Sequence, residues 1–169
     1  RSNKWGLYVK LADNTRAEEV VIESELAMTP MSWSGDRLVY WTGDPKTAGD
    51  IWSVTLTGDK KPMPIVQTRA DERNPQVSPD GKWIAYSANE TGRSEAYVEP
   101  WPGPSWKIQI SAEGGTDPLW NHLGSEIFYR DGDKMMVVPV RTAGEFEAGA
   151  PRLLWEGRYS HGMSSSCGP

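Results

Sequence analysis

Side chains that could take part in chemistry gather in two short segments, 68–74 and 114–117. The first supplies Arg69, Asp71, Arg73 and Asn74, and the second supplies Thr116 and Asp117. Such a mixture of charged, amide and hydroxyl groups can bind a polar ligand. It can equally do no more than satisfy backbone groups between neighbouring structural units, because Asp, Asn and Thr side chains commonly bond nearby backbone atoms.

Arrangements typical of catalysis are absent from the sequence. The string 162–166 comes nearest to a nucleophile elbow, but it lacks the second glycine of that motif. His122 and His161 are too few to supply a metal site built from several histidines. His122 sits where a turn residue is expected, which favours an exposed turn histidine over a base. No phosphate-binding glycine loop, His-Arg-Asp or Asp-Phe-Gly of a kinase occurs.

Acidic residues form three local clusters: Asp71 with Glu72, Glu18 with Glu19, and Asp131 with Asp133. Glycoside hydrolysis needs two carboxyl groups held a few ångströms apart across a cleft, and these clusters belong to separate loops. A solvated loop face is therefore the preferred interpretation. We predict a protein without enzymatic activity, metal or cofactor.

Composition excludes several classes of partner. The formal net charge of −5 and the isoelectric point near 5.1, with no basic cluster, argue against nucleic-acid binding. No apolar run is long enough for a transmembrane helix. The chain has nine Trp and six Tyr residues, and side chains of these types commonly cover the faces of β-sheets. Trp101 and Trp106 could instead form an exposed platform for a sugar or peptide.

A repeated unit predicts the architecture. Three segments, 30–40, 75–86 and 118–129, share one pattern. Each has an apolar strand that begins with proline, then a tight turn, then a second strand that ends in tyrosine. The spacing of about 40–50 residues is that of a four-stranded propeller blade. In the middle copy, Pro79, Asp80 and Gly81 are suited to a tight reversal. We predict an all-β fold, a partial β-propeller of about three and a half blades.

The repeat also predicts boundaries and a core. The expected units are the second half of a blade at 1–28, blades at 29–73, 74–116 and 117–159, and an irregular tail at 160–169. Residues at matching positions should be buried between blades: Trp52, Tyr97, Tyr40, Tyr86, Tyr129, Ile84 and Ile127. Uncovered apolar faces at both ends of such an array predict a homodimer that closes the ring.

Residues 75–81, 83–86 and 94–100 resemble the WD-like repeats of TolB-type propellers, and the likeness extends over nearly all of residues 1–159. Residues 74–87, 95–104 and 134–140 are most similar to the propeller region carried by bacterial serine/threonine protein kinases. The resemblance implies a sensor or interaction module in a periplasmic or extracytoplasmic compartment, here as a truncated gene product. The alternative is an accessory propeller of a prolyl-oligopeptidase-like hydrolase or of a carbohydrate-active enzyme without its catalytic part.

Overall fold

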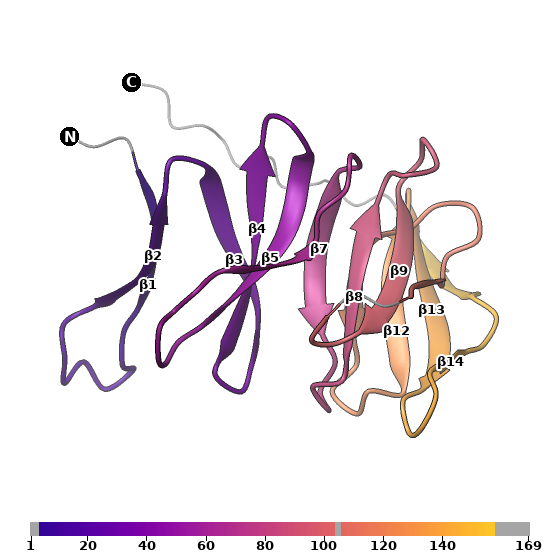
Figure 1. Cartoon of the computed structure of the whole chain (residues 1–169). Helices are drawn as coiled ribbons and strands as arrows, with labels where there is room; N and C mark the ends of the chain where they lie inside the picture. The colour runs from indigo at the N-terminus through magenta and orange to yellow at the C-terminus, as the bar shows by residue number, and fades with distance from the viewer. Residues whose placement is uncertain (1–3, 104–105, 158–169) are drawn as a thin grey trace.

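The chain folds into a row of antiparallel β-sheets that follow one another in sequence order (Figure 1). The computed structural model describes residues 4–103 and 106–157, and within these ranges every helix or strand found is a strand. The all-β prediction is therefore confirmed. The predicted tail, with His161, the string 162–166 and Cys167, lies outside the described residues.

Each sheet is a meander of neighbouring strands. The first sheet pairs β1 (Trp5–Val9) with β2 (Glu19–Ser24). The second contains β3 (Ala27–Ser34), β4 (Arg37–Asp44), β5 (Ala48–Thr55) and β6 (Met63–Val66). The third contains β7 (Glu72–Val77), β8 (Trp83–Ala88), β9 (Glu95–Pro100) and β10 (Ile108–Gln109).

The last sheet pairs β11 (Thr116–Trp120), β12 (Glu126–Asp131) and β13 (Lys134–Arg141) in order. Two further strands, β14 (Glu147–Ala148) and β15 (Arg152–Glu156), both pair with β13. The first strands of consecutive sheets, β3, β7 and β11, contact one another across the sheets. This is the arrangement of inner strands in neighbouring propeller blades.

The hydrophobic core lies between consecutive sheets. One cluster joins the first two sheets: Leu7, Val21, Met28, Leu38, Tyr40 and Val54. A second joins the β3–β6 and β7–β10 sheets: Val39, Ile51, Ile65, Val66, Ile84, Tyr86, Ala88, Tyr97 and Trp101. A third joins the last two sheets: Trp83, Ala85, Ala96, Val98, Ile110, Trp120, Ile127, Tyr129, Val138 and Phe146. Every residue of β8 is buried, because this sheet has a neighbour on each face.

The predicted core is confirmed for six of its seven residues: Tyr40, Tyr86, Tyr97, Tyr129, Ile84 and Ile127. Trp52 is only partly buried against the first core cluster.

The predicted turns are also present. Ser34 pairs with Arg37, which leaves Gly35 at φ 59° and Asp36 as a two-residue hairpin loop. Gly81, at φ 68°, closes the turn by donating from its backbone N–H to the carbonyl of Ser78.

The inner strands begin earlier than the sequence predicts. Arg73 and Asn74 belong to β7, and Thr116 and Asp117 belong to β11, so these four are not residues of connecting loops. The ladder is irregular between Arg73 and Gln76 and between Thr116 and Leu119, where Pro75 and Pro118 cannot donate a backbone hydrogen bond. The two-residue strand β14 was not predicted, because a pair of residues carries no periodicity.

Candidate functional site

The rim where the inner strands β7 and β11 begin carries most of the predicted polar cluster. Asn74 and Asp117 both precede a proline and both adopt left-handed backbone conformations, at φ 53° and 54°. Asn and Asp tolerate this conformation better than other non-glycine residues. Asn74 Nδ2 donates a hydrogen bond to Asp117 Oδ1, and Thr116 Oγ1 donates to Asp117 Oδ2 at 3.1 Å. The amide and the carboxylate therefore join two neighbouring blades.

A pocket of about 410 Å³ opens at this rim. It is lined by the cluster residues Arg73, Asn74, Thr116 and Asp117 together with Ser87, Ser94 and Gly132. The lining combines a guanidinium group, a carboxylate, an amide and three hydroxyl groups, so it offers hydrogen-bond donors and acceptors in one place. Four of the six predicted site residues thus line a common pocket, which we call the rim pocket.

Asp71 extends the rim towards the preceding blade. Arg73 Nε donates to Asp71 Oδ2 at 2.7 Å, and the Arg73 guanidinium carbon lies 5.1 Å from the centroid of the Trp41 ring. The backbone N–H of Asp71 donates to Asn89 Oδ1 at 2.8 Å. This stacked ion pair orients the half-exposed Arg73 side chain.

Close packing beneath the ion pair explains the glycine at position 49. A Cβ atom on Gly49 would lie 2.3 Å from both Asp71 Oδ1 and Trp41 Nε1. Neither of these buried atoms has a hydrogen-bond partner among the described residues. Gly49 therefore allows the carboxylate and the indole to approach the β5 backbone.

Arg69, the sixth predicted residue, faces a different pocket. That pocket has a volume of about 470 Å³ and is lined by Thr68, Arg69, Ala70, Asn89, Glu90 and Lys107. Arg69 is not among the residues that line the rim pocket. The six residues therefore do not form one site.

The interpretation of Glu72 as part of a solvated loop face is wrong. Glu72 is fully buried, and its carboxylate accepts a hydrogen bond from Thr68 Oγ1. Burial raises the pKa of Glu72 to about 7, and the nearby Asp50 and Glu90 charges add to this effect. The sequence places Glu72 directly after Asp71 in a polar stretch, so only the packing of the blades reveals that it is buried.

Sequence reasoning also missed the buried acid Glu99, which has an exposed fraction of 5%. Burial raises the pKa of Glu99 to about 7 as well. Glu99 directly follows the apolar run 96–98 of strand β9, and this position was a signal in the sequence, because a charge beside such a run is expensive to bury.

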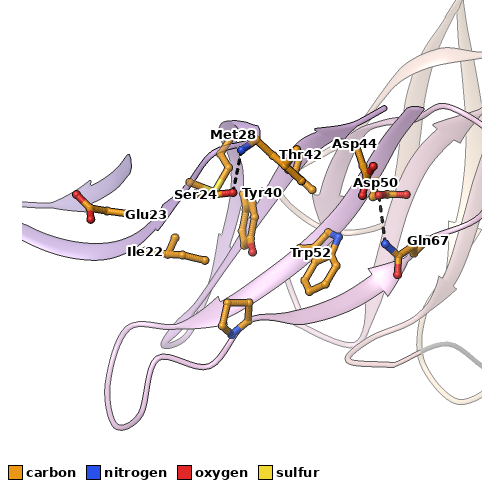
Figure 2. Close-up of a pocket in the computed structure, with 12 residues that line it drawn as sticks. Ile22, Glu23, Ser24, Met28, Tyr40, Thr42, Asp44, Asp50, Trp52 and Gln67 are labelled. Carbon is orange, nitrogen blue, oxygen red and sulfur yellow. Dashed lines mark hydrogen bonds between the residues drawn. The ribbon is translucent and has the colours of Figure 1, made fainter. Parts of the chain in front are cut away.

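Another buried acid, Asp50, borders a smaller pocket between β2 and the β3–β6 sheet (Figure 2). The pocket has a volume of about 190 Å³, and Figure 2 shows Tyr40 and Trp52 lining it. Asp50 accepts hydrogen bonds from Thr47 Oγ1 at 2.7 Å and from Gln67 Nε2 at 3.4 Å. Burial raises the pKa of Tyr40 to about 12, so its hydroxyl stays protonated.

Three other sequence-based candidates have clear positions. Trp101 is buried, whereas Trp106 is half-exposed with its ring centroid 5.8 Å from that of Trp83. The two tryptophans therefore do not form a shared exposed platform. His122 is exposed in the turn between β11 and β12.

Among the described residues, no group of three or more His, Cys, Asp and Glu is placed to hold a metal ion. In the same part of the chain, no helix is long and apolar enough to cross a membrane.

No protein-family model matches the sequence, and no curated protein is similar enough to show a family. Solved structures do resemble it. A TolB of Agrobacterium tumefaciens superposes with a TM-score of 0.59 at 19% identity, over 89% of this chain and 62% of that one. TolB of Acinetobacter baumannii gives a TM-score of 0.61 at 16% identity, over 83% and 36% of the two chains.

Prolyl oligopeptidase B of Galerina marginata, solved with a 35mer substrate, gives a TM-score of 0.60 at 10% identity. The match covers 90% of this chain and 24% of that enzyme. The chain spans less than two thirds of the length of each of these proteins. At such low identity the likeness concerns the fold, and it shows that the chain is a partial β-propeller of the kind found in TolB proteins.

Proposed function

We propose that the protein is a non-enzymatic binding module that recognises an extended peptide at the rim pocket. The observation that carries this proposal is the pocket of about 410 Å³, in which Arg73, Asn74 and Asp117 present donors and acceptors together. Peptide backbones offer both kinds of group, so a mixed lining suits them. The resemblance of residues 74–87 and 95–104 to propellers of bacterial serine/threonine kinases supports a sensor or interaction role.

The neighbouring folds are compatible with a peptide ligand, since prolyl oligopeptidase B was solved with a 35mer substrate. The test is to select peptides from a random library on the intact protein and to measure their affinities by fluorescence anisotropy. Arg73→Ala and Asp117→Asn should weaken binding about tenfold, as expected when a charged hydrogen-bond partner is lost.

The matched control is Arg16→Ala, which removes an exposed arginine far from the rim pocket in sequence. Binding that is equally strong in the two rim variants and the control would contradict the proposal. Failure to select any peptide would contradict it as well.

We also propose that two copies associate through uncovered sheet faces. Trp5, Tyr8 and Val20 are exposed on the β1–β2 sheet, and Leu153, Leu154 and Trp155 are exposed on β15. Propeller blades bury such faces against the next blade, and a second copy would offer the complementary faces. Light scattering at low micromolar concentration should give twice the chain mass of 18.8 kDa. A monomer would contradict this, and a polydisperse mass would indicate open-ended association.

The second candidate function is an accessory propeller of a hydrolase. The likeness to the propeller of prolyl oligopeptidase B favours it, because that propeller belongs to a peptide-cleaving enzyme. A hydrolysis screen with aminoacyl, peptidyl and glycosyl substrates distinguishes the two. Turnover abolished by one serine or carboxylate substitution in this chain would overturn the non-enzymatic proposal, and inactivity of the protein alone would agree with it.

A further inference from the structure

A separate cavity lies between the β3–β6 and β7–β10 sheets, away from the rim pocket. Its volume is about 380 Å³, within the size range of small-molecule sites. Ile65, Val66 and Thr68 line it from one sheet and the connection that follows, and Tyr86, Glu99 and Lys107 line it from the next blade. We call it the Glu99 pocket.

The carboxylate of Glu99 is only half satisfied. Tyr86 donates from its hydroxyl to Glu99 Oε2 at 3.3 Å. The other oxygen, Oε1, is buried and has no hydrogen-bond partner among the described residues. A buried acceptor without a partner is costly, so a donor supplied by a ligand would be favoured here.

Lys107 lines the pocket, but its ammonium group contacts side chains other than Glu99. This group forms an ion pair with Glu90 and lies 4.8 Å from the centroid of the Tyr97 ring. The charged groups that act on Glu99 are the cation of Lys107 and the carboxylates of Glu72 and Glu90. With Glu99 itself, the carboxylates outnumber this cation, so the electrostatic environment favours a positively charged ligand.

We propose that the Glu99 pocket binds a small organic cation, an alkylammonium or alkylguanidinium group, with an N–H donating to Glu99 Oε1. The alkyl portion packs against Ile65 and Val66, which are buried in the adjoining core. An organic cation fits better than a metal ion, since no group of three metal-binding side chains occurs in the described part of the chain. The cation can be a free amine or the side chain of a lysine or arginine in a peptide.

Protonation of Glu99 makes binding depend on pH. Burial raises the pKa of this carboxyl to about 7. The titratable groups that act on it are Tyr86 on β8, Glu72 on β7, Glu90 after β8 and Lys107 before β10. A bound cation stabilises the ionised carboxylate. Affinity should therefore rise as the pH increases from about 6 to about 8.

The experiment is isothermal titration calorimetry of the full chain with n-butylamine and with n-butylguanidine at about pH 8. Glu99→Gln should reduce the affinity at least about tenfold, because it removes the charged acceptor and keeps the shape. This variant should still fold, since its amide oxygen can accept the Tyr86 hydrogen bond. The matched control, Glu113→Gln, makes the same change on an exposed side chain and should bind as the wild type does.

Lys107→Gln separates electrostatics from structural damage. Removing this cation should strengthen binding several-fold, whereas simple disruption of the pocket would weaken it. Neutral N-butylacetamide tests whether charge is needed, and a tripeptide with a central lysine or arginine tests the peptide source against the free amine. Binding of CaCl₂ that depends on Glu99 would overturn the organic cation in favour of a metal.

Three other results would also overturn the proposal. They are no binding of either amine at millimolar concentration, equal binding of N-butylacetamide, and unchanged affinity in Glu99→Gln. These outcomes are independent of peptide recognition at the rim pocket, because none of the residues changed lines that pocket.

Discussion

Asn74 and Asp117 occupy corresponding positions in two neighbouring blades and are joined by a hydrogen bond between their side chains. Each precedes the proline that begins a sequence repeat, and each has a left-handed backbone conformation. The conformation places the two polar groups on the same rim and interrupts the regular strand pairing. The same local irregularity, repeated in successive blades, thus forms both the contact between blades and the lining of the rim pocket.

Replacing Asn74 should separate the contributions of conformation and hydrogen bonding. Asn74→Ala loses the hydrogen bond to Asp117 and also has to hold a left-handed conformation, at a cost of about 1–2 kcal/mol. Asn74→Gly loses the hydrogen bond alone. Urea unfolding should therefore rank stability as wild type, then Asn74→Gly, then Asn74→Ala. Equal stability of the two variants would show that the backbone at this position is not left-handed in solution.

Tyr86 tests the packing between the second and third sheets. Its side chain is fully buried, with its ring centroid 5.9 Å from that of Tyr97. Tyr86→Ala should lower the free energy of unfolding by about 3–5 kcal/mol, as expected for removal of a large core aromatic residue. Leu123→Ala, at an exposed turn position, is the control and should change stability little. An unchanged melting temperature for Tyr86→Ala would mean that the strand register is wrong.

Glu72 and Glu99 should make the folded state less stable as the pH rises. Both carboxyl groups have pKa values raised to about 7 by burial, from a usual value of 4.5. The folded state therefore binds more protons at these two groups than the unfolded state between these values. Their contribution to stability is complete below about pH 4.5 and is lost as the pH rises through about 7.

Each of the two acids should contribute a decline on the order of 2–3 kcal/mol. Denaturant unfolding from about pH 5 to about pH 8 measures it. The double variant Glu72→Gln with Glu99→Gln should show a flatter profile, and Glu113→Gln should retain the wild-type slope. A wild-type stability that rises over this range would contradict the burial of the two acids.

Adding a side chain at Gly49 should destabilise the protein. The added methyl group of Gly49→Ala would lie 2.3 Å from Asp71 Oδ1 and from Trp41 Nε1, and 3.1 Å from the backbone oxygen of Glu72. Overpacking of this kind costs about 1–3 kcal/mol. Thermal unfolding should show a smaller cost of Gly49→Ala in an Asp71→Ala background, because one clashing group is gone. An equal cost in both backgrounds would exclude a close approach of Asp71 to Gly49.

Local sequence features account for much of the fold. The turns at Gly35 and Gly81 follow from residues that are adjacent in the chain, so their types reveal the reversals directly. The tyrosines in the second strand of each repeat are buried as the repeat predicts, although each strand continues beyond its tyrosine. The polar segments that supply Arg73, Asn74, Thr116 and Asp117 were also recognisable, since each directly precedes the proline that opens a repeat.

Tertiary packing decided which side chains meet and which are buried. Arg69 and Arg73 are close in sequence, yet they line different pockets, because the chain passes from the β6–β7 connection into the inner strand between them. Glu72 and Glu99 are polar by composition, but neighbouring blades close over them and remove them from water. Burial of a charge depends on contacts between segments that are far apart in the chain. Local sequence can therefore determine turns and strands, whereas the protonation of these acids depends on how the blades pack.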